Sequence, residues 1–265
     1  MIVRRMALGV SLLLAAGHAA VAAAAGFAAL VSPPRFELTS GAGTTVRQVF
    51  ELTNRSAAPA KFRVHTADFT LGADYSVSFQ DELQPDSCRP WAAIERPEVA
   101  LPGGGTIRYR FEVQVPKDAP AGECRFGILI EGEEPAVAES GALRLPVVGR
   151  IGVIVYVIVG EARPQIEVFG PQVLTLNGQK VPALRVHNAG TAHARISGFL
   201  SGRDAKGIKY DFNPSDLPIL PGDVREVFLT PSTPRNDHPT LAFPVTVHGT
   251  LEWGNQSTEL NERFE

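Results

Sequence analysis

The stretch "TIRYRFEVQV", residues 106–115, shows the clearest alternation of apolar and polar side chains in the sequence. Successive side chains of a β-strand point to opposite faces, so every second residue here belongs to one apolar face. That face consists of Ile107, Tyr109, Phe111, Val113 and Val115. The pattern predicts an antiparallel strand with one face in a core and the other in water.

The same two-residue period recurs along the chain, and no segment after residue 26 shows a sustained helical period. Further examples are "VRQVFEL" (46–52), "KFRVHT" (61–66), "CRFGILI" (124–130) and "VTVHGTLEW" (245–253). The 25 glycines and 21 prolines among 265 residues suit many turns between short strands. We therefore expect an all-β fold.

Two pairs of matching segments indicate an internal repeat. "LTNRSAAPAKF" (52–62) resembles "VHNAGTAHARI" (186–196), and "LPGGGTIRYRF" (101–111) resembles "LPGDVREVFL" (220–229). Asn54 and Asn188 hold the same place in their segments, where asparagine suits a turn because it bonds its own backbone. The order is kept in both halves, which predicts two tandem immunoglobulin-like β-sandwich domains, residues 27–160 and 161–265.

The first 26 residues have the features of a secretory signal peptide that is cleaved. Arg4 and Arg5 precede an apolar segment and the small-residue tract "AAVAAAAG". No later segment is long and apolar enough to span a membrane, so we expect a soluble exported protein. The net charge of −3 and the lack of a basic run argue against a nucleic-acid partner.

Cys88 and Cys124 are the two cysteines of the chain. An even number of cysteines in an exported protein favours a disulfide. The pair forms no CxxC motif, so neither a redox site nor a zinc site is indicated. We predict a structural bond between Cys88 and Cys124.

The segment "SGALRLPVVGRIGVIVYVIVG", residues 140–160, is strongly apolar but is interrupted by two arginines. Its β-branched residues favour a strand over a membrane span. The run from Ile151 to Val159 predicts a buried strand, whereas the alternation before it, with Pro146, predicts a hydrophobic edge strand over residues 141–149. Hydrophobic edges recruit other strands, so we expect this edge to pair with a partner.

The sequence shows no pattern that indicates an active site, a cofactor or a metal site. It carries no GxSxG, phosphate-binding or dinucleotide-binding motif. His187 and His193 lie on either side of a predicted hairpin loop, where we expect solvated histidines and not metal ligands. We therefore expect a protein that is not an enzyme and that uses no cofactor or metal.

Taken in order, several segments resemble the periplasmic chaperones of the chaperone–usher pilus pathway, over nearly the whole chain after residue 26. "VSPPRFELTSG" (31–41) resembles the first strand of that family, and "CRFGILIEGEEP" (124–135) resembles the strand before its long loop. "ALRLPVVGRIGVIVYV" (142–157) resembles the last strand of its N-terminal domain. The resemblance implies two immunoglobulin-like domains, a periplasmic location and pilus-type protein subunits as partners, with an outer-membrane usher as a second partner.

The same resemblance implies which residues bind a subunit. In this family the last strand of the N-terminal domain donates alternating apolar residues to a subunit that lacks a strand, a form of β-strand addition. The matching residues are Leu143, Leu145 and Val147. The family also holds the terminal carboxylate of the subunit with two basic residues, and Arg35 matches the first. This chain has Gly152 at the second position, and Arg150, two residues earlier on the same face, is the candidate replacement.

The leading hypothesis is therefore a chaperone or a chaperone-like assembly factor. The alternative is a secreted or surface β-sandwich protein with a structural or adhesive role and no client. A carbohydrate-binding accessory module is a third reading, although Trp91 and Trp253 fit core positions better than sugar platforms. The first two differ at the three apolar residues of the predicted edge, which a chaperone needs accessible and a structural protein should cover.

Overall fold

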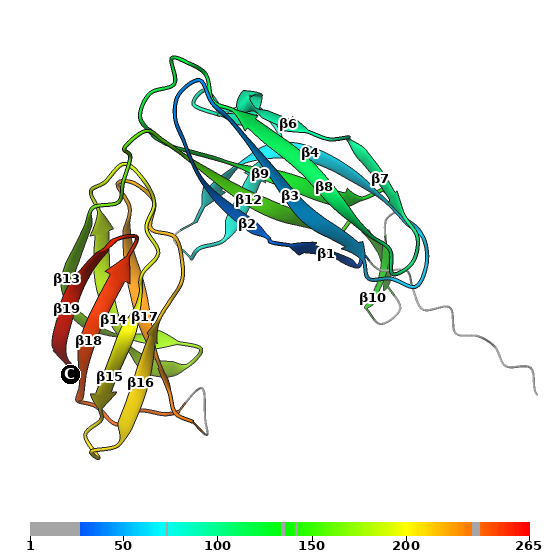
Figure 1. The fold of residues 1–265 in the computed structure, drawn as a ribbon. Helices are drawn as coiled ribbons and strands as arrows, with labels where there is room; N and C mark the ends of the chain where they lie inside the picture. Colours follow the sequence, from blue (N-terminus) through cyan, green and yellow to red (C-terminus); the bar gives the residue numbers. More distant parts are fainter. Residues whose placement is uncertain (1–26, 73, 134–135, 141–142, 235–238) are drawn as a thin grey trace, which may run out of the picture.

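The computed structural model describes residues 27–265 with the exception of 73, 134–135, 141–142 and 235–238. Figure 1 shows two β-rich bodies that meet at an angle, one built before residue 160 and one after it. The expected all-β fold of two immunoglobulin-like sandwiches is confirmed. The predicted signal peptide lies outside the described residues. Within those residues, no helix is long and apolar enough to cross a membrane.

The N-terminal domain is a sandwich of two sheets. The first, here called the β3 sheet, contains in spatial order β1 (Ala29–Ser32), β3 (Thr45–Asn54), β8 (Thr106–Gln114) and β6 (Ala92–Ile94). The second, called the β12 sheet, contains in spatial order β2 (Arg35–Ser40), β12 (Arg150–Val159), β9 (Gly122–Gly132), β4 (Ala60–Leu71) and β5 (Val77–Gln80). Strand β7 (Glu98–Leu101) also pairs with β4.

The core of this domain lies between the two sheets, and the alternation of β8 accounts for its contribution. Tyr109, Phe111 and Val113 are buried, whereas Arg108 and Arg110 on the opposite face are exposed. Each such large apolar side chain contributes about 1.5 to 3 kcal/mol when it leaves water. The half-buried strand that the sequence predicts is therefore present with the predicted face inward.

The first strand of the chain changes sheets part-way along its length. β1 pairs with β3, while β2, which starts three residues later, pairs in parallel with β12. Pro33 and Pro34 are the two residues between the strands, and the peptide bond between Ser32 and Pro33 is cis. A proline has no backbone N–H to donate, so neither ladder continues through this point.

Strand β12 is an interior strand along most of its length. It pairs with β9 from Arg150 to Val159 and with β2 from Ile154 to Val159. Val153, Val155, Val157 and Val159 are buried in the core between the sheets. The buried strand expected over residues 151–159 is therefore confirmed from residue 153 onward, with Ile154 and Ile158 half-buried on the opposite face.

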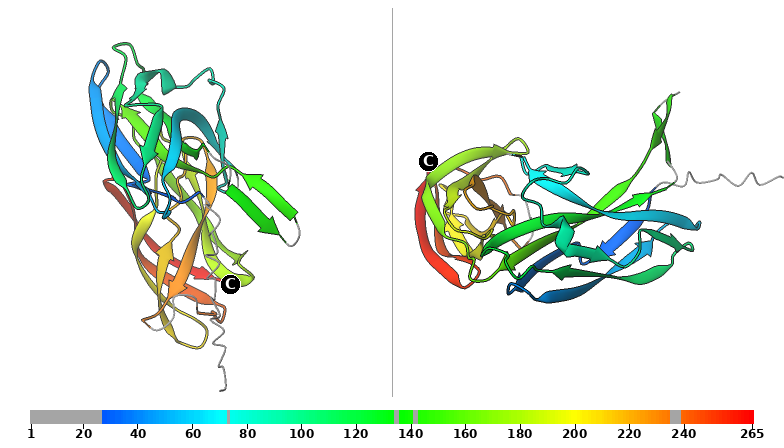
Figure 2. Two further views of the ribbon diagram at one scale, coloured as in Figure 1. Left: turned by 90° about the vertical axis from the view of Figure 1, so that its right-hand side faces the viewer. Right: turned by 90° about the horizontal axis from the view of Figure 1, so that it is seen from above.

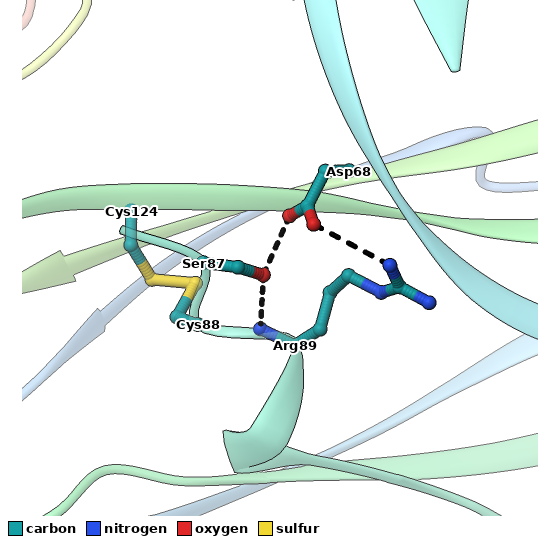
Figure 3. The surroundings of a disulfide bond; sticks show 5 residues. All are labelled: Asp68, Ser87, Cys88, Arg89 and Cys124. Carbon is teal, nitrogen blue, oxygen red and sulfur yellow. Dashed lines mark hydrogen bonds and ion pairs between the residues drawn. A yellow bond between two sulfur atoms is a disulfide. The ribbon is translucent and has the colours of Figure 1, made fainter. Parts of the chain in front are cut away.

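Cys88 and Cys124 form the predicted disulfide, which attaches the loop before η1 (Arg89–Trp91) to β9. Figure 3 shows that Asp68 lies near this bond and contacts Ser87 and Arg89, the residues on either side of Cys88. The hydroxyl of Ser87 donates to Asp68 Oδ1 over 2.6 Å, and Arg89 Nη1 lies 3.4 Å from Asp68 Oδ2. The loop is thus held by a covalent bond and by a buried carboxylate at adjacent positions.

The C-terminal domain is built from one continuous sheet of seven strands that folds over its own core. Its spatial order is β13 (Ile166–Leu176), β14 (Gln179–Asn188), β17 (Val224–Ser232), β16 (Lys209–Pro214), β15 (Ser197–Arg203), β18 (Val245–Trp253) and β19 (Gln256–Phe264). The end strands β13 and β19 come side by side (Figure 1). The core includes Phe212, Leu229 and Trp253. The boundary between residues 160 and 161 stays a prediction.

The repeated turns place their asparagines in the same way. Asn54 is 1% exposed, and its Nδ2 donates to the carbonyls of Ala58 (2.8 Å) and Pro102 (3.1 Å). Asn188 is 0% exposed, and its Nδ2 donates to Ala192 (2.8 Å) and Ile219 (2.9 Å). The amide of Asn54 therefore ties its loop to the Leu-Pro-Gly segment of its domain, and that of Asn188 ties its loop to Ile219, the residue directly before the second such segment.

We expect replacement of both Cys88 and Cys124 by serine to lower the free energy of unfolding by about 2 to 4 kcal/mol, because the bond closes a loop between residues 36 apart. Urea unfolding of the oxidised wild type and of the double variant measures the difference. As a control, the same titration with reductant should lower the stability of the wild type and leave the variant unchanged. Equal stability of the two oxidised proteins would contradict a structural role.

Candidate functional site

The three residues expected to be donated, Leu143, Leu145 and Val147, lie on β11 (Leu143–Val147). β11 pairs antiparallel with β10 (Ala136–Ser140), so the edge strand expected over residues 141–149 has an internal partner that the sequence did not suggest. Figure 2 shows this two-stranded hairpin projecting from the N-terminal domain at the end away from the C-terminal domain. Among the strand pairs of the described residues, the second edge of β11 has no partner. Residues 141–142 lie outside the described chain.

The start of β12 continues this unpaired edge. Because β2 begins at Arg35, opposite Ile154, it leaves the first four residues of β12 without a partner on that side among the described strands. Those residues, Arg150–Val153, are bonded to β9 on their other side. Val148, which joins the two strands, is 56% exposed. The unpaired edges of β11 and of early β12 therefore follow one another along the chain.

The two candidate carboxylate-binding arginines are not brought together. Arg35 is in register with Ile154, four positions along β12 from Arg150. Arg35 pairs with Glu37 (Nε to Oε1, 2.9 Å) and lies 3.9 Å from Asp216 of the C-terminal domain. Arg150 lies 3.6 Å from Glu131 on β9. Both arginines are partly exposed, and each already faces a carboxylate of this chain.

Gly152, which the resemblance marks as a missing basic residue, has a packing role. The ring of Phe79 on β5 covers both Gly152 and Gly127. A Cβ atom at Gly152 would lie 2.6 Å from Phe79 Cζ, and one at Gly127 would lie 2.7 Å from Phe79 Cε1. A side chain at position 152 therefore fits only if the ring moves. This contact could not be predicted from the sequence, because β5 is a four-residue strand without a clear pattern.

The outer face of the β12 sheet receives the C-terminal domain through an apolar contact. Leu220 packs against Phe69 on β4 and Tyr156 on β12, and all three are buried. Leu220 belongs to the Leu-Pro-Gly segment that Asn188 holds. Burying apolar side chains from both domains favours one arrangement of the two bodies over free rotation about their linker.

Arg225 makes a second contact between the domains. Its guanidinium donates to the carbonyl of Gly72 (Nη1 to O, 2.6 Å) and lies 5.0 Å above the ring of Tyr75, both in the β4–β5 turn. Asp223 neutralises the charge, with its Oδ2 2.8 Å from Arg225 Nη2. Tyr75 in turn donates to the carbonyl of Glu226 (3.3 Å). Hydrogen bonds in both directions thus connect the β4–β5 turn to the start of β17.

His193 is not the solvated loop histidine that the sequence suggests. It is 6% exposed, and its ring stacks on Tyr156 with the centroids 4.0 Å apart. Its Nδ1 lies 2.6 Å from Oε2 of Glu123 on β9. His187, by contrast, stays within the C-terminal domain, where its Nδ1 lies 3.1 Å from Glu167. The sequence could not separate the two histidines, because only the docking of the domains buries one of them.

We expect Gly152→Ala to lower the free energy of unfolding by about 1 to 3 kcal/mol, since the added methyl group overlaps the ring of Phe79. In a Phe79→Ala background the same change should have little effect, which a double-mutant cycle by urea unfolding measures. Gly170→Ala on β13 is the matched control, because a Cβ there meets no atom within 4 Å. An equal loss in both backgrounds would show that the ring does not exclude side chains at position 152.

Comparison with known proteins gives matches in structure alone. No family model matches the chain, and no curated protein matches it. Among solved structures, the class 5 fimbriae chaperone CfaA matches with a TM-score of 0.48 and 14% identity, over 88% of this chain and 98% of that one. The structure of Salmonella enterica SafA pilin with the SafB chaperone matches with a TM-score of 0.46 and 15% identity, over 91% and 98%.

A third match is the complex of the chaperone CsuC with the tip adhesion subunit CsuE from Acinetobacter baumannii. It has a TM-score of 0.45 and 11% identity, over 89% of this chain and 99% of that one. With TM-scores below 0.5 and such low identities, the three matches carry no argument about what this chain binds.

Proposed function

We propose that this chain is a periplasmic chaperone, or a chaperone-like assembly factor, that binds pilus- or fimbrial-type subunits by donating an edge β-strand. The observation that carries the proposal is the edge formed by β11 and the start of β12, which has no strand partner on one side among the described residues. Subunits of this class are the partners present in the SafB and CsuC structures.

An added strand would be held in two ways. The backbone groups of Arg150–Val153 that face away from β9 would bond to the main chain of the subunit, which gives affinity without regard to sequence. The alternating residues Leu143, Leu145 and Val147 would enter apolar pockets of the subunit, each contributing about 1.5 to 3 kcal/mol when fully buried. Their spacing of two places all three on one face of the strand.

Anchoring of the terminal carboxylate of a subunit by Arg35 and Arg150 remains part of the proposal. Each arginine would have to exchange a carboxylate of this chain, Glu37 or Glu131, for that of the subunit. Such an exchange keeps the number of ion pairs constant, so it would select a binding register more than it would add affinity. The proposal further includes export by residues 1–26, an outer-membrane usher as a second partner, and no enzymatic activity.

Replacing Leu143, Leu145 and Val147 together with serine should abolish capture of the subunit and leave folding unchanged. The reason is that these residues lie on β11, which pairs with the hairpin strand β10 and with no strand of the β12 sheet. Thermal unfolding of the purified variant and copurification of pilin-type subunits from periplasm measure the two effects on the same samples.

Two controls make this outcome specific. Val153→Asn with Val155→Asn should unfold the N-terminal domain, because both side chains are 0% exposed and a buried amide would lack partners. Phe199→Ser removes an 85%-exposed aromatic ring from the C-terminal domain and should leave folding and capture intact. Loss of cooperative unfolding in the triple variant would instead favour a structural protein, and normal capture by a folded triple variant would refute strand donation.

A further inference from the structure

His193 links the two domains through two carboxylates on different strands of the N-terminal domain. Its Nδ1 and its backbone N–H both contact Glu123 Oε2 on β9, at 2.6 and 2.7 Å. Its Nε2 lies 3.5 Å from Glu37 Oε1 on β2. The side chains of His193 and Glu123 are 3% and 0% exposed, so water competes little for the contact between them, whereas Glu37 is 42% exposed. One imidazole of the C-terminal domain thus bridges β2 and β9, on either side of β12.

The charged form of the imidazole fits this place better than the neutral form. Only a protonated imidazole donates from both nitrogens, and here each nitrogen faces a carboxylate oxygen. Burial alone lowers the pKa of His193, but contacts with Glu123 and Glu37 outweigh it and raise the pKa above its usual 6.5. In return, the contact with His193 is the main reason that the pKa of Glu37 is lowered, against the effect of burial.

Several other charged and titratable groups lie around the imidazole and its neighbours. They are Arg35 and Glu37 on β2, Glu123 and Arg125 on β9, Tyr156 on β12, and Arg195 and Asp216 from the C-terminal domain. The pKa of Tyr156 is raised above its usual 10, chiefly by burial. An imidazole is the side chain whose usual pKa lies nearest to neutral pH, so the proposal concerns the protonation of His193.

We propose that His193 is a pH-sensitive clasp that fixes the angle between the two domains when it is protonated and loosens when it loses the proton. A neutral imidazole has one N–H, and the shorter contact, to Glu123, would keep it. The bridge to Glu37 on β2 is then lost, while Leu220 and Arg225 still hold the domains in contact. The result is a wider range of domain angles and not separation.

The direction of the pH dependence follows from linkage. Consider a group whose pKa is higher when the domains are docked than when they are apart. It stabilises docking fully at pH values below its pKa in the undocked state. This stabilisation is lost as the pH rises through its pKa in the docked state. His193 therefore stabilises docking fully below about pH 6.5 and progressively less above it. At the acidic end the contribution of Glu37 is lost, because its lowered pKa requires the ionised form.

Two spin labels, one on each domain, measure the domain angle in the full mature protein. Arg108→Cys and Lys209→Cys place them on exposed strand positions of the N- and C-terminal domains. At about pH 6 the distance distribution should be narrow, and at about pH 9 it should broaden. With His193→Gln added, the pH response should be lost. The matched control is His187→Gln, which removes another imidazole–carboxylate pair but one within the C-terminal domain, and it should keep the wild-type response.

A second measurement needs no folded His193 variant. NMR titration of the histidine rings in the wild type should give a midpoint for His193 above 6.5. Glu37→Gln should lower that midpoint. In the same variant, the distribution of distances between the spin labels should broaden at a lower pH than in the wild type. The proposal is overturned if the wild-type distance distribution is the same at both pH values, if His193→Gln responds as the wild type does, or if His193 titrates at or below 6.5. These readouts require no client, so their failure is separate from failure of the proposed function.

Discussion

The change of sheet at Ser32 is the constraint on which the rest of the N-terminal domain depends. A strand that paired with β12 along its whole length would close the β12 sheet on that side. Because two prolines interrupt the first strand, its early part pairs with β3 and its later part starts only opposite Ile154. One continuous segment therefore supplies a strand to each sheet, β1 to the β3 sheet and β2 to the β12 sheet. It leaves β12 with an unpaired edge at the end nearest the hairpin. Packing and accessibility of the edge thus have a common cause.

The opposite face of β12 serves the junction between the domains. Residues of one parity, Val153 to Val159, fill the core, while those of the other parity meet Phe79, Leu220 and His193. A single strand therefore carries the core, the free edge and the docking surface at once. Both faces of β12 are covered, and its edge toward β2 is unpaired only before Ile154.

The parts of the fold that depend on local pattern could be predicted from the sequence. The alternation of residues 106–115 identified a half-buried strand, and the two matching asparagine segments identified two domains. The disulfide followed from an even number of cysteines together with the predicted signal peptide. These signals work because neighbouring residues determine burial and turn geometry directly.

The candidate site could be predicted only in part, because its other contacts join residues far apart in the chain. Glu123 and His193 are separated by 70 positions and meet only when the domains dock. From the sequence, Gly152 could be recognised only as the absence of a basic residue, because the ring of Phe79 that covers it comes from a distant strand. Apolar and polar residues alternate only weakly in β10, so its pairing with β11 could not be predicted from its residues.

The buried amide of Asn54 has a consequence for producing the protein. Asn54, Arg55 and Ser56 form an acceptor sequence for N-linked glycosylation, and the sugar would be attached to the nitrogen that donates to Ala58 and Pro102. In a eukaryotic secretory host, a glycan added there before folding would replace one of the two N–H donors of that nitrogen and block burial of the side chain. Asn255, in the second such sequence, is exposed and would carry a sugar without disturbing the core. A host that does not attach N-linked sugars avoids this competition between modification and folding.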